Sequence, residues 1–290
     1  MKRKLTTFLL LLVTTTIFAQ YPTNGLVAYY PFTGNANDMS GNGYNGTNNY
    51  ATLTTDRFGN PNAAYFFNGS SSYISIPTTP FLLQDYSYSV WAFPMANPAV
   101  EDKMMVICIG GSGGDQHITF ANLYNPIIAL GWAFANYNVS SSYNWWSQSS
   151  LPQLNIWYHI VVTRESSFYK IYINDVLVNS QVPNGVIPDY SSTPFATIGK
   201  RSQPSITQFF NGKIDDIGFY NRALTQLEVD TLFYANYIGI NENSNNSTNI
   251  NPNTFVFDNT LTISTSLFIN SKNINLRISN LLGQTLYNKV

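Results

Sequence analysis

Two stretches of this 290-residue chain decide its fold: GLVAYYPFTGNANDMSGNGYNG at Gly25–Gly46 and FNGKIDDIGFYNRAL at Phe210–Leu224. Each stretch places a run of apolar and aromatic residues, which suits a pleated and half-buried strand, beside a polar turn with carboxylates. The two stretches therefore predict two strands of a β-domain and the places where a metal ion or a sugar could be held.

Short strands are expected between these two stretches because apolar runs recur there between turn signals. In the run from Tyr86 to Phe93, apolar and polar residues alternate, with Tyr88, Val90 and Ala92 on one face. This period of two, with turns every 8–12 residues, predicts an all-β fold, an antiparallel β-sandwich. The expected strands are Leu26–Phe32, Ala64–Phe67, Tyr73–Ile76, Tyr86–Phe93, Met104–Ile109, Ile118–Ala121, Ile127–Phe134, Trp157–Arg164, Phe168–Ile173, Val176–Gln181, Phe195–Ile198 and Lys213–Tyr220.

Two local signals interrupt the strand pattern. Asn174-Asp175 lies between two expected strands, and both residues tolerate a positive φ, so the pair predicts a hairpin turn. Thr225 followed by Glu228 three residues later forms a capping box, which predicts one helix over Thr225–Leu232.

The composition suits a β-domain with long polar loops. Hydrophobic residues make up 44% of the chain, which is ample for a core, and aromatic residues reach 15%. Charged residues are only 10%, against about 25% in typical domains. The net charge of -1 gives no electrostatic footprint for nucleic acid, so no nucleic-acid partner is expected.

The N-terminus has the pattern of a signal peptide. Lys2, Arg3 and Lys4 precede the apolar run Leu5–Phe18, and Ala19 offers a cleavage site, so residues 1–19 are expected to be removed. The alternative is a membrane anchor, but the run is short of the roughly 20 residues that a spanning helix needs. No other long apolar run follows, which predicts a secreted or outer-surface protein without a membrane span after cleavage.

Cysteine usage adds one constraint. Cys108 is the only cysteine, so no disulfide can form within the chain, and packing must stabilise the exported protein.

With these segments in order, residues 25–235 resemble a bacterial laminin-G-like domain, a concanavalin A-like jelly roll. The similarity rests on the opening strand and loop, on AYFFNGSSSYISI at Ala64–Ile76, on WYHIVVTRESSFYKIYIND at Trp157–Asp175, and on Phe210–Leu224. Asp175 stands where that family usually has glycine. The resemblance implies one sandwich domain over residues 20–238 and a scaffold that mostly serves binding.

The C-terminal part resembles a second family. Residues 239–254 form an Asn-rich linker. Residues 255–290 form a β-rich tail whose segment LRISNLLGQTL at Leu276–Leu286 is similar to the C-terminal sorting domain of Bacteroidetes proteins exported by the type IX system. The match is partial, because that domain normally continues for about 30 more residues. The resemblance implies the export machinery as a partner, and the alternative is a small autonomous hairpin.

Calcium is the metal that the residues favour. The run from Asn35 to Gly43 offers carboxylate, amide and carbonyl oxygens, which are the ligands that calcium prefers. The laminin-G-like resemblance implies Asp38 together with Asp215 or Asp216 as ligands of a structural calcium ion. The alternative is an Asn- and Asp-rich turn with a pair of acids at a strand end.

A sugar site is expected around Tyr143, Trp145 and Trp146, within a polar stretch from Asn136 to Gln153 that is interpreted as a loop. Adjacent tryptophans cannot both face a core from one strand, so one of them should be exposed or in a groove. The stretch lacks Lys and Arg, which favours a neutral glycan. The alternative is a loop tucked against the sandwich surface.

No enzyme is predicted. A glycosidase needs two facing carboxyl groups, and the adjacent pair Asp215-Asp216 is expected to point to opposite faces of its strand. Asp115 and His117 are interpreted as a loop pair, Cys108 as core, and His159 as a structural hydrogen-bonding residue.

The sequence therefore predicts a secreted or cell-surface binding module, carbohydrate-binding or adhesive. The alternatives are a structural spacer without a small ligand and, less favoured, a polysaccharide hydrolase of the same fold.

Overall fold

The computed structural model describes residues 21–78, 85–111, 114–123, 129–138, 143–148, 150–166, 168–182, 195–201, 208–234, 276–279 and 285–289. The chain divides into two compact units, Met1–Tyr237 and Ile238–Val290. The expected signal peptide and the Asn-rich linker lie outside the described residues, so both stay predictions.

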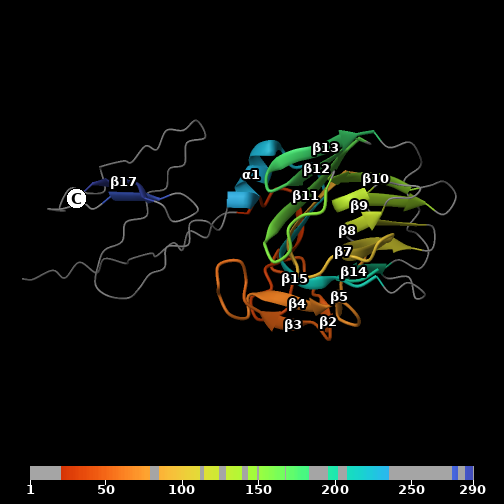
Figure 1. The fold of residues 1–290 in the computed structure, drawn as a ribbon. Helices are drawn as coiled ribbons and strands as arrows, with labels where there is room; N and C mark the ends of the chain where they lie inside the picture. The colour runs from red at the N-terminus through yellow and green to blue at the C-terminus, as the bar shows by residue number, and fades with distance from the viewer. Residues whose placement is uncertain are drawn as a thin grey trace, which may run out of the picture. The chain divides into compact units, whose positions relative to one another are not determined.

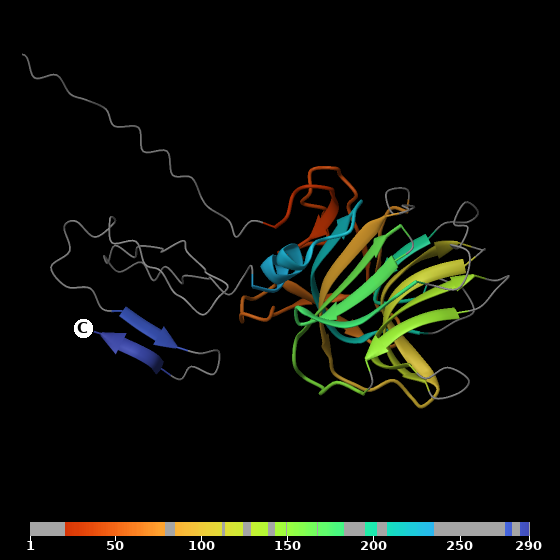
Figure 2. The same ribbon diagram turned by 90° about the horizontal axis from the view of Figure 1, so that it is seen from above.

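The first unit is a β-sandwich of two antiparallel sheets, seen edge-on in Figure 1 and from above in Figure 2. Sheet A has the strand order β13 (Val176–Gln181), β12 (Phe168–Ile173), β11 (Tyr158–Glu165), β6 (Tyr86–Pro94), β15 (Asn211–Tyr220), β4 (Ala64–Asn68) and β3 (Thr52–Thr54), and β1 (Leu26–Tyr30) also pairs with β15. Sheet B has the order β10 (Tyr143–Gln148), β9 (Ala129–Asn138), β8 (Gly114–Leu123), β7 (Asp102–Gly111), β14 (Phe195–Ile198), β5 (Tyr73–Ser75) and β2 (Thr47–Asn49). The predicted all-β antiparallel sandwich is confirmed.

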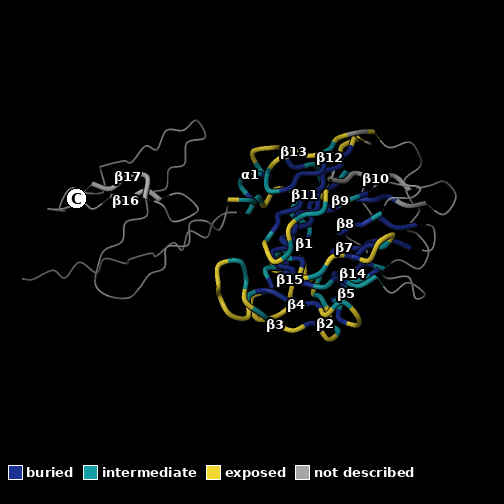
Figure 3. Tube along the Cα trace, in the orientation of Figure 1, coloured by how far each residue is buried: buried dark blue, intermediate teal, exposed yellow. Residues whose placement is uncertain are grey.

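The main core lies between the two sheets, where the strands carry buried residues (Figure 3). Tyr88, Val90 and Ala92 of β6 belong to this core, as their alternation predicted. Trp91 is also buried, but it is not part of the core between the sheets. It lies on the other face of sheet A, called here the outer face, as the period of two requires.

The helix α1 (Gln226–Tyr234) packs on this outer face. Val229 and Leu232 form a small apolar cluster with Val161, Tyr172 and Tyr220 of the sheet, among other residues. At the N-terminus of α1, the Glu228 carboxylate accepts a hydrogen bond from the Thr225 backbone N–H at 2.9 Å, and Thr225 Oγ1 accepts one from the Glu228 N–H at 3.3 Å. The predicted capping box is therefore confirmed.

The predicted turn at Asn174-Asp175 is also confirmed. Ile173 pairs directly with Val176, and both turn residues have positive φ, 49° and 64°. This is the conformation that a two-residue hairpin turn of the primed types requires.

Three strands were not predicted. β2 and β3 have only three residues each, among which Leu53 is the single apolar residue, and β10 is an edge strand within a polar stretch. Such strands lack the apolar alternation on which the prediction depends, because neither face of a short or edge strand has to be fully buried.

In the second unit, the described residues form one antiparallel pair, β16 (Leu276–Ser279) with β17 (Thr285–Lys289). This pair lies within the tail that was expected to be rich in β-structure. No helix in the described part of the chain is long and apolar enough to cross a membrane.

Candidate functional site

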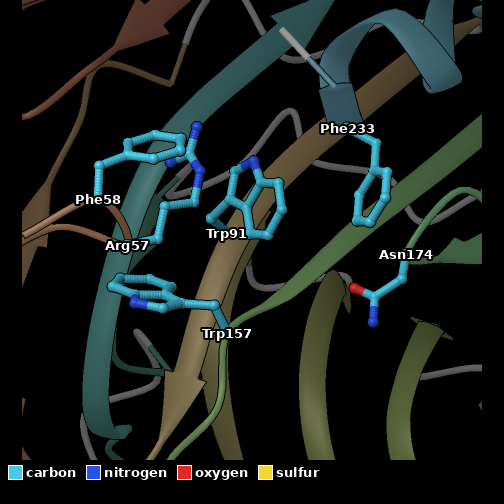
Figure 4. Close-up of a pocket in the computed structure, with 6 residues that line it drawn as sticks. All are labelled: Arg57, Phe58, Trp91, Trp157, Asn174 and Phe233. Atoms are coloured by element: carbon cyan, nitrogen blue, oxygen red, sulfur yellow. The ribbon is translucent and has the colours of Figure 1, made fainter. Parts of the chain in front are cut away.

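A pocket of about 300 Å³ opens on the outer face of sheet A (Figure 4). Its lining comes from five places in the sequence: the loop after β3, strand β6, the residue before β11, the turn after β12, and helix α1. The lining residues are Arg57, Phe58, Trp91, Trp157, Asn174 and Phe233. The pocket therefore has aromatic walls with one guanidinium and one amide, and its size is at the lower end of small-molecule sites, about 300–1,000 Å³.

Strand register places the floor of the pocket. Trp91 of β6 lies directly opposite His159 on one side and Asp215 on the other, so all three side chains share the outer face. The Trp91 and His159 rings stack at 5.0 Å between centroids, and Phe233 of α1 stacks on Trp91 at 5.6 Å. The alternation that buries the core thus also aligns this row.

Arg57 covers the other side of the row. Its guanidinium carbon lies 4.3 Å from the centroid of the Trp91 ring and 4.4 Å from that of Phe58. The same guanidinium contacts Asp215 Oδ2 at 3.1 Å through Nη1 and Asp216 Oδ2 at 2.7 Å through Nη2. Two buried carboxylates and a stacked arginine therefore form one layer of direct contacts next to the pocket.

A β-bulge allows both carboxylates to reach Arg57. The register between β15 and β6 shifts between Asp215 and Gly218, and Asp216 has a positive φ of 44°. The expectation that adjacent acids point to opposite faces was wrong, because a bulge breaks the alternation of an ideal strand. Tyr29 Oη completes the arrangement by donating a hydrogen bond to Asp216 Oδ1 at 2.8 Å.

Burial controls the protonation of this layer. Burial raises the pKa of Asp215 well above its usual value, and the Asp216 carboxylate raises it further, while Arg57 opposes both. Burial also lowers the pKa of His159 to about 3, and the charge of Arg57 adds to this. His159 is therefore neutral, and its Nε2 forms a hydrogen bond of 2.8 Å with Ser89 Oγ, as expected of a buried hydrogen-bonding residue.

Asp38 occupies a different position from the two strand acids. Its carboxylate accepts four hydrogen bonds of 2.8–3.0 Å, from the backbone N–H groups of Tyr29, Ser40 and Tyr44 and from Ser40 Oγ. Although burial acts to raise it, these hydrogen bonds hold the pKa of Asp38 below its usual value. Asp38 closes its own loop onto β1.

The positions of Asp38, Asp215 and Asp216 determine whether these carboxylates could bind one calcium ion together. Tyr29 lies between Asp38 and Asp216, with its backbone N–H on Asp38 and its hydroxyl on Asp216. The place between Asp215 and Asp216 where a cation would be held is taken by Arg57. These residues fit a network closed by protein donors better than a calcium cage, and calcium binding stays a prediction for titration.

Tyr143, Trp145 and Trp146 lie on β10, at the edge of sheet B, and not in a loop. Trp146 pairs with Phe134 and Trp145 with Ala135 of β9. The structure describes the backbone of these residues but not their side chains, so their predicted contact with a glycan is outside the described part.

A further cluster of buried polar side chains was not predicted from the sequence. Asp115 and His117 lie on strand β8, not in a loop, and Cys108 of β7 pairs directly with His117. One potential ligand atom from each of the three side chains lies within 4.8 Å of the other two. Asp115 and His117 are two residues apart, which is the spacing of side chains on one face of a strand. The Gly-rich run before Asp115 is typical of a turn, so the start of β8 was not predicted.

The charges around this cluster favour a structural role over a metal site. Asp115 Oδ1 accepts the 2.8 Å contact of His117 Nδ1, and Arg201 reaches Asp115 Oδ2 from Nε and Nη2 at 2.9 and 2.8 Å. Lys103 is buried nearby, and Arg201 lowers its pKa after the larger effect of burial. Two cations beside one carboxylate oppose a divalent ion.

The chain is similar to known proteins of the same fold. A family model described as the concanavalin A-like lectin/glucanases superfamily matches residues 68–230, which is more than half of the chain. The chain belongs to this superfamily. Among curated protein sequences, no significant match is found.

Solved structures show the same fold at low sequence identity. Domain 4 of AbnA, a GH43 extracellular arabinanase from Geobacillus stearothermophilus in complex with arabinotriose, has 20% identity and a TM-score of 0.59 over 71% of this chain and 97% of that chain. The binding domain of Paraclostridial Mosquitocidal Protein 1 has 18% identity and a TM-score of 0.58 over 73% and 52%. Trypanosoma rangeli sialidase has 17% identity and a TM-score of 0.52 over 74% and 33%.

Proposed function

We propose that this member of the concanavalin A-like superfamily is a secreted or cell-surface module that binds a neutral glycan in the pocket on the outer face of sheet A. The observation that carries the proposal is the lining of that pocket: Phe58, Trp91, Trp157 and Phe233 supply aromatic faces. Aromatic walls with few polar groups are the usual composition of small-molecule sites.

The polar groups of the pocket suit hydroxyl groups better than an acidic ligand. Arg57 is already neutralised by Asp215 and Asp216 at 3.1 and 2.7 Å. Asn174 Oδ1 accepts a hydrogen bond from the His159 backbone N–H at 2.9 Å, which fixes the amide and leaves its Nδ2 to donate to a ligand. Trp91 Nε1 is a buried donor that has no hydrogen-bond partner in the described part of the chain.

The related module in a solved complex supports this proposal by analogy. Domain 4 of AbnA was solved with arabinotriose, and a likeness of 20% identity carries only the fold to this chain. The aromatic residues Tyr143, Trp145 and Trp146 of β10 remain a second place where the same glycan could bind.

Variants of aromatic residues at the protein surface test the proposal. Isothermal titration calorimetry of the full chain with a panel of neutral oligosaccharides should give Kd values of about 10⁻⁵ to 10⁻³ M for at least one glycan. Trp157→Ala should weaken binding about tenfold or more, because Trp157 is only partly buried and its removal spares the core. Phe168→Ala is the matched control, since Phe168 is 40% exposed on β12 and does not line the pocket.

The possible outcomes separate the alternatives. Loss of affinity in Trp145→Ala or Trp146→Ala, with Trp157→Ala unaffected, would move the site to β10. Absence of binding to every glycan would favour the structural spacer. Release of reducing ends from a polysaccharide would instead favour the hydrolase, although both strand acids are held by Arg57.

Export is the second part of the proposal. The signal-peptide pattern and the partial similarity of the tail to type IX sorting domains support secretion through that machinery. Fusion of residues 239–290 to a reporter in a host with this system, compared with a fusion that lacks them, measures whether the tail directs export.

A further inference from the structure

Arg164 lies in the interior of the sandwich, remote from the pocket's outer face. It is 3% exposed, and it pairs across β11 with Tyr86 of β6 on one side and with Tyr169 of β12 on the other. Both tyrosines belong to the core between the sheets. Because directly paired residues share a face, Arg164 also points inward.

Amide groups of sheet B face this row. Gln116 Oε1 accepts a hydrogen bond from the Tyr86 hydroxyl, and Gln116 Nε2 donates to Tyr88 Oη at 2.6 Å. Asn136 Nδ2 donates to Tyr169 Oη at 3.2 Å. Arg164 therefore lies in a buried polar layer that contains hydroxyl and amide groups and that includes, among the described residues, no carboxylate paired with it.

Two of the three guanidinium nitrogens of Arg164 lack a hydrogen-bond partner among the described residues. Its Nε and Nη1 have no hydrogen-bond partner in the described part of the chain, and neither does the buried Asn136 Oδ1. Its contacts are with the tyrosine rings, whose centroids lie 5.9 Å (Tyr86) and 5.6 Å (Tyr169) from the guanidinium carbon. These distances are near the outer limit of about 6 Å for a cation–π interaction.

A buried charge of this kind needs a partner of opposite charge or strong hydrogen-bond acceptors. A guanidinium stays protonated in proteins, unlike a buried lysine, histidine or carboxylate. Nor do the neighbouring hydroxyls supply a counter-charge, since burial raises the pKa of Tyr88 well above its usual value and keeps it neutral. Two distant ring contacts do not offset the cost of an unpaired buried charge.

We propose that the layer around Arg164 binds a small monovalent anion, either a halide or a single carboxylate group. The anion accepts hydrogen bonds from Nε and Nη1 and neutralises the guanidinium. The unpaired Asn136 Oδ1 sets a preference, because it can accept a hydrogen bond from a hydroxyl next to a carboxylate. The site is distinct from the neutral-glycan pocket and does not depend on it.

Thermal unfolding of the full chain tests the proposal. The ionic strength is held constant with sodium HEPES, which is gradually replaced by chloride, acetate or glucuronate. In the wild type, a small anion at about ten times its dissociation constant should raise Tm by about 3–6 °C in a saturable way. Arg164→Gln should abolish the rise, whereas Arg222→Gln, which changes a surface arginine paired with Glu228, should retain it.

The anions distinguish the source of the charge. A rise with chloride alone indicates a free ion, and a stronger effect of glucuronate than of acetate indicates the carboxylate of a sugar. Equal responses of wild type and Arg164→Gln, or no response of the wild type, would overturn the proposal.

A second measurement covers the case in which Arg164→Gln does not fold. Wild-type crystals grown in bromide should show an anomalous peak within hydrogen-bond distance of Arg164 Nε or Nη1. A water molecule in that position, with bromide bound elsewhere or absent, would refute the anion site.

Discussion

The side chain of Arg57 and the whole of Arg164 are almost completely buried, yet their surroundings differ. Arg57 lies on the outer face of sheet A with two carboxylates at 3.1 and 2.7 Å, whereas Arg164 lies between the sheets with tyrosine rings and amides. The first arginine is satisfied by its own chain and can serve as a wall of a binding pocket. The second has donors without a partner in the described part of the chain, which is the basis of the proposed anion site. Burial of a charge therefore says little about its role until its partners are known.

The largest expected effect contrasts these two arginines directly. Arg57→Met should lower the free energy of unfolding at pH 7 by about 3–5 kcal/mol, because it leaves Asp215 and Asp216 buried without their cation. Arg164→Met, in buffer without small anions, should raise it, since the variant removes a buried charge that has no carboxylate partner among the described residues. Urea unfolding of both variants measures the difference, and equal losses would contradict the comparison.

The second prediction concerns pH and the row beside Arg57. The folded pKa of His159 is about 3, below its ordinary value of 6.5, so the unfolded chain takes up a proton first as the pH falls. This contribution to stability is complete above pH 6.5 and is lost as the pH falls towards 3. Between pH 6.5 and 4 the loss should be about 3 kcal/mol.

The control for this prediction of pH dependence is His159→Gln, which retains His117 and all carboxylates. The difference in free energy of unfolding between wild type and this variant should shrink as the pH falls from 6.5 to 4. A difference independent of pH would show that His159 does not titrate in this range.

The third prediction tests whether the acids near Arg57 have a metal as an additional partner. If Asp38 with Asp215 or Asp216 binds calcium, a concentration of 100 times Kd should stabilise the chain by about 2.7 kcal/mol. Chelation should then lower Tm, and Asp38→Ala should remove the response. An identical melt with and without chelator would reject the site and leave the hydrogen-bonded network as the whole explanation.

The smallest expected change in the free energy of unfolding concerns Arg222, an arginine at the protein surface. Arg222 and the Thr225 cap hold the pKa of Glu228 at about 2, the contact with Arg222 being the larger cause. Glu228→Gln should cost about 1 kcal/mol at pH 7, because it weakens one helix cap and one exposed ion pair. A double-mutant cycle with Glu228→Gln and Arg222→Gln, measured as free energies of unfolding, separates the contribution of the ion pair from that of the cap. A coupling energy of zero would assign the whole loss to the cap.

Local patterns predicted much of the fold. The apolar alternation of β6, the turn at Asn174-Asp175 and the capping box at Thr225 all lie within a few residues, so each could be read without knowing the neighbouring strands. The membership in the superfamily followed from the order of such segments. β2, β3 and β10 were not predicted, because short and edge strands need not alternate.

The candidate site was predicted poorly, and the reason is physical. Asp215 and Asp216 were named, but their meeting depends on a bulge that the sequence pattern does not display. Asp115, His117 and Cys108 were named and then set aside as a loop pair and a core residue, since their convergence depends on the pairing of β7 with β8. Trp157 and Phe58 became candidate binding residues only because the folded structure brings them together in the lining of one pocket.

The sequence by itself thus determined the class of fold, most of the strands of the sandwich and the hairpin turn at Asn174-Asp175, because hydrophobic periodicity and backbone preference act over short distances. Tertiary structure alone decided which charges are paired. Arg57 and Asp215 are 158 residues apart in the chain, and Arg164 has no comparable partner among the described residues. Contacts across such separations depend on strand register and on bulges, so the chemistry of both arginines exists only in the folded sandwich.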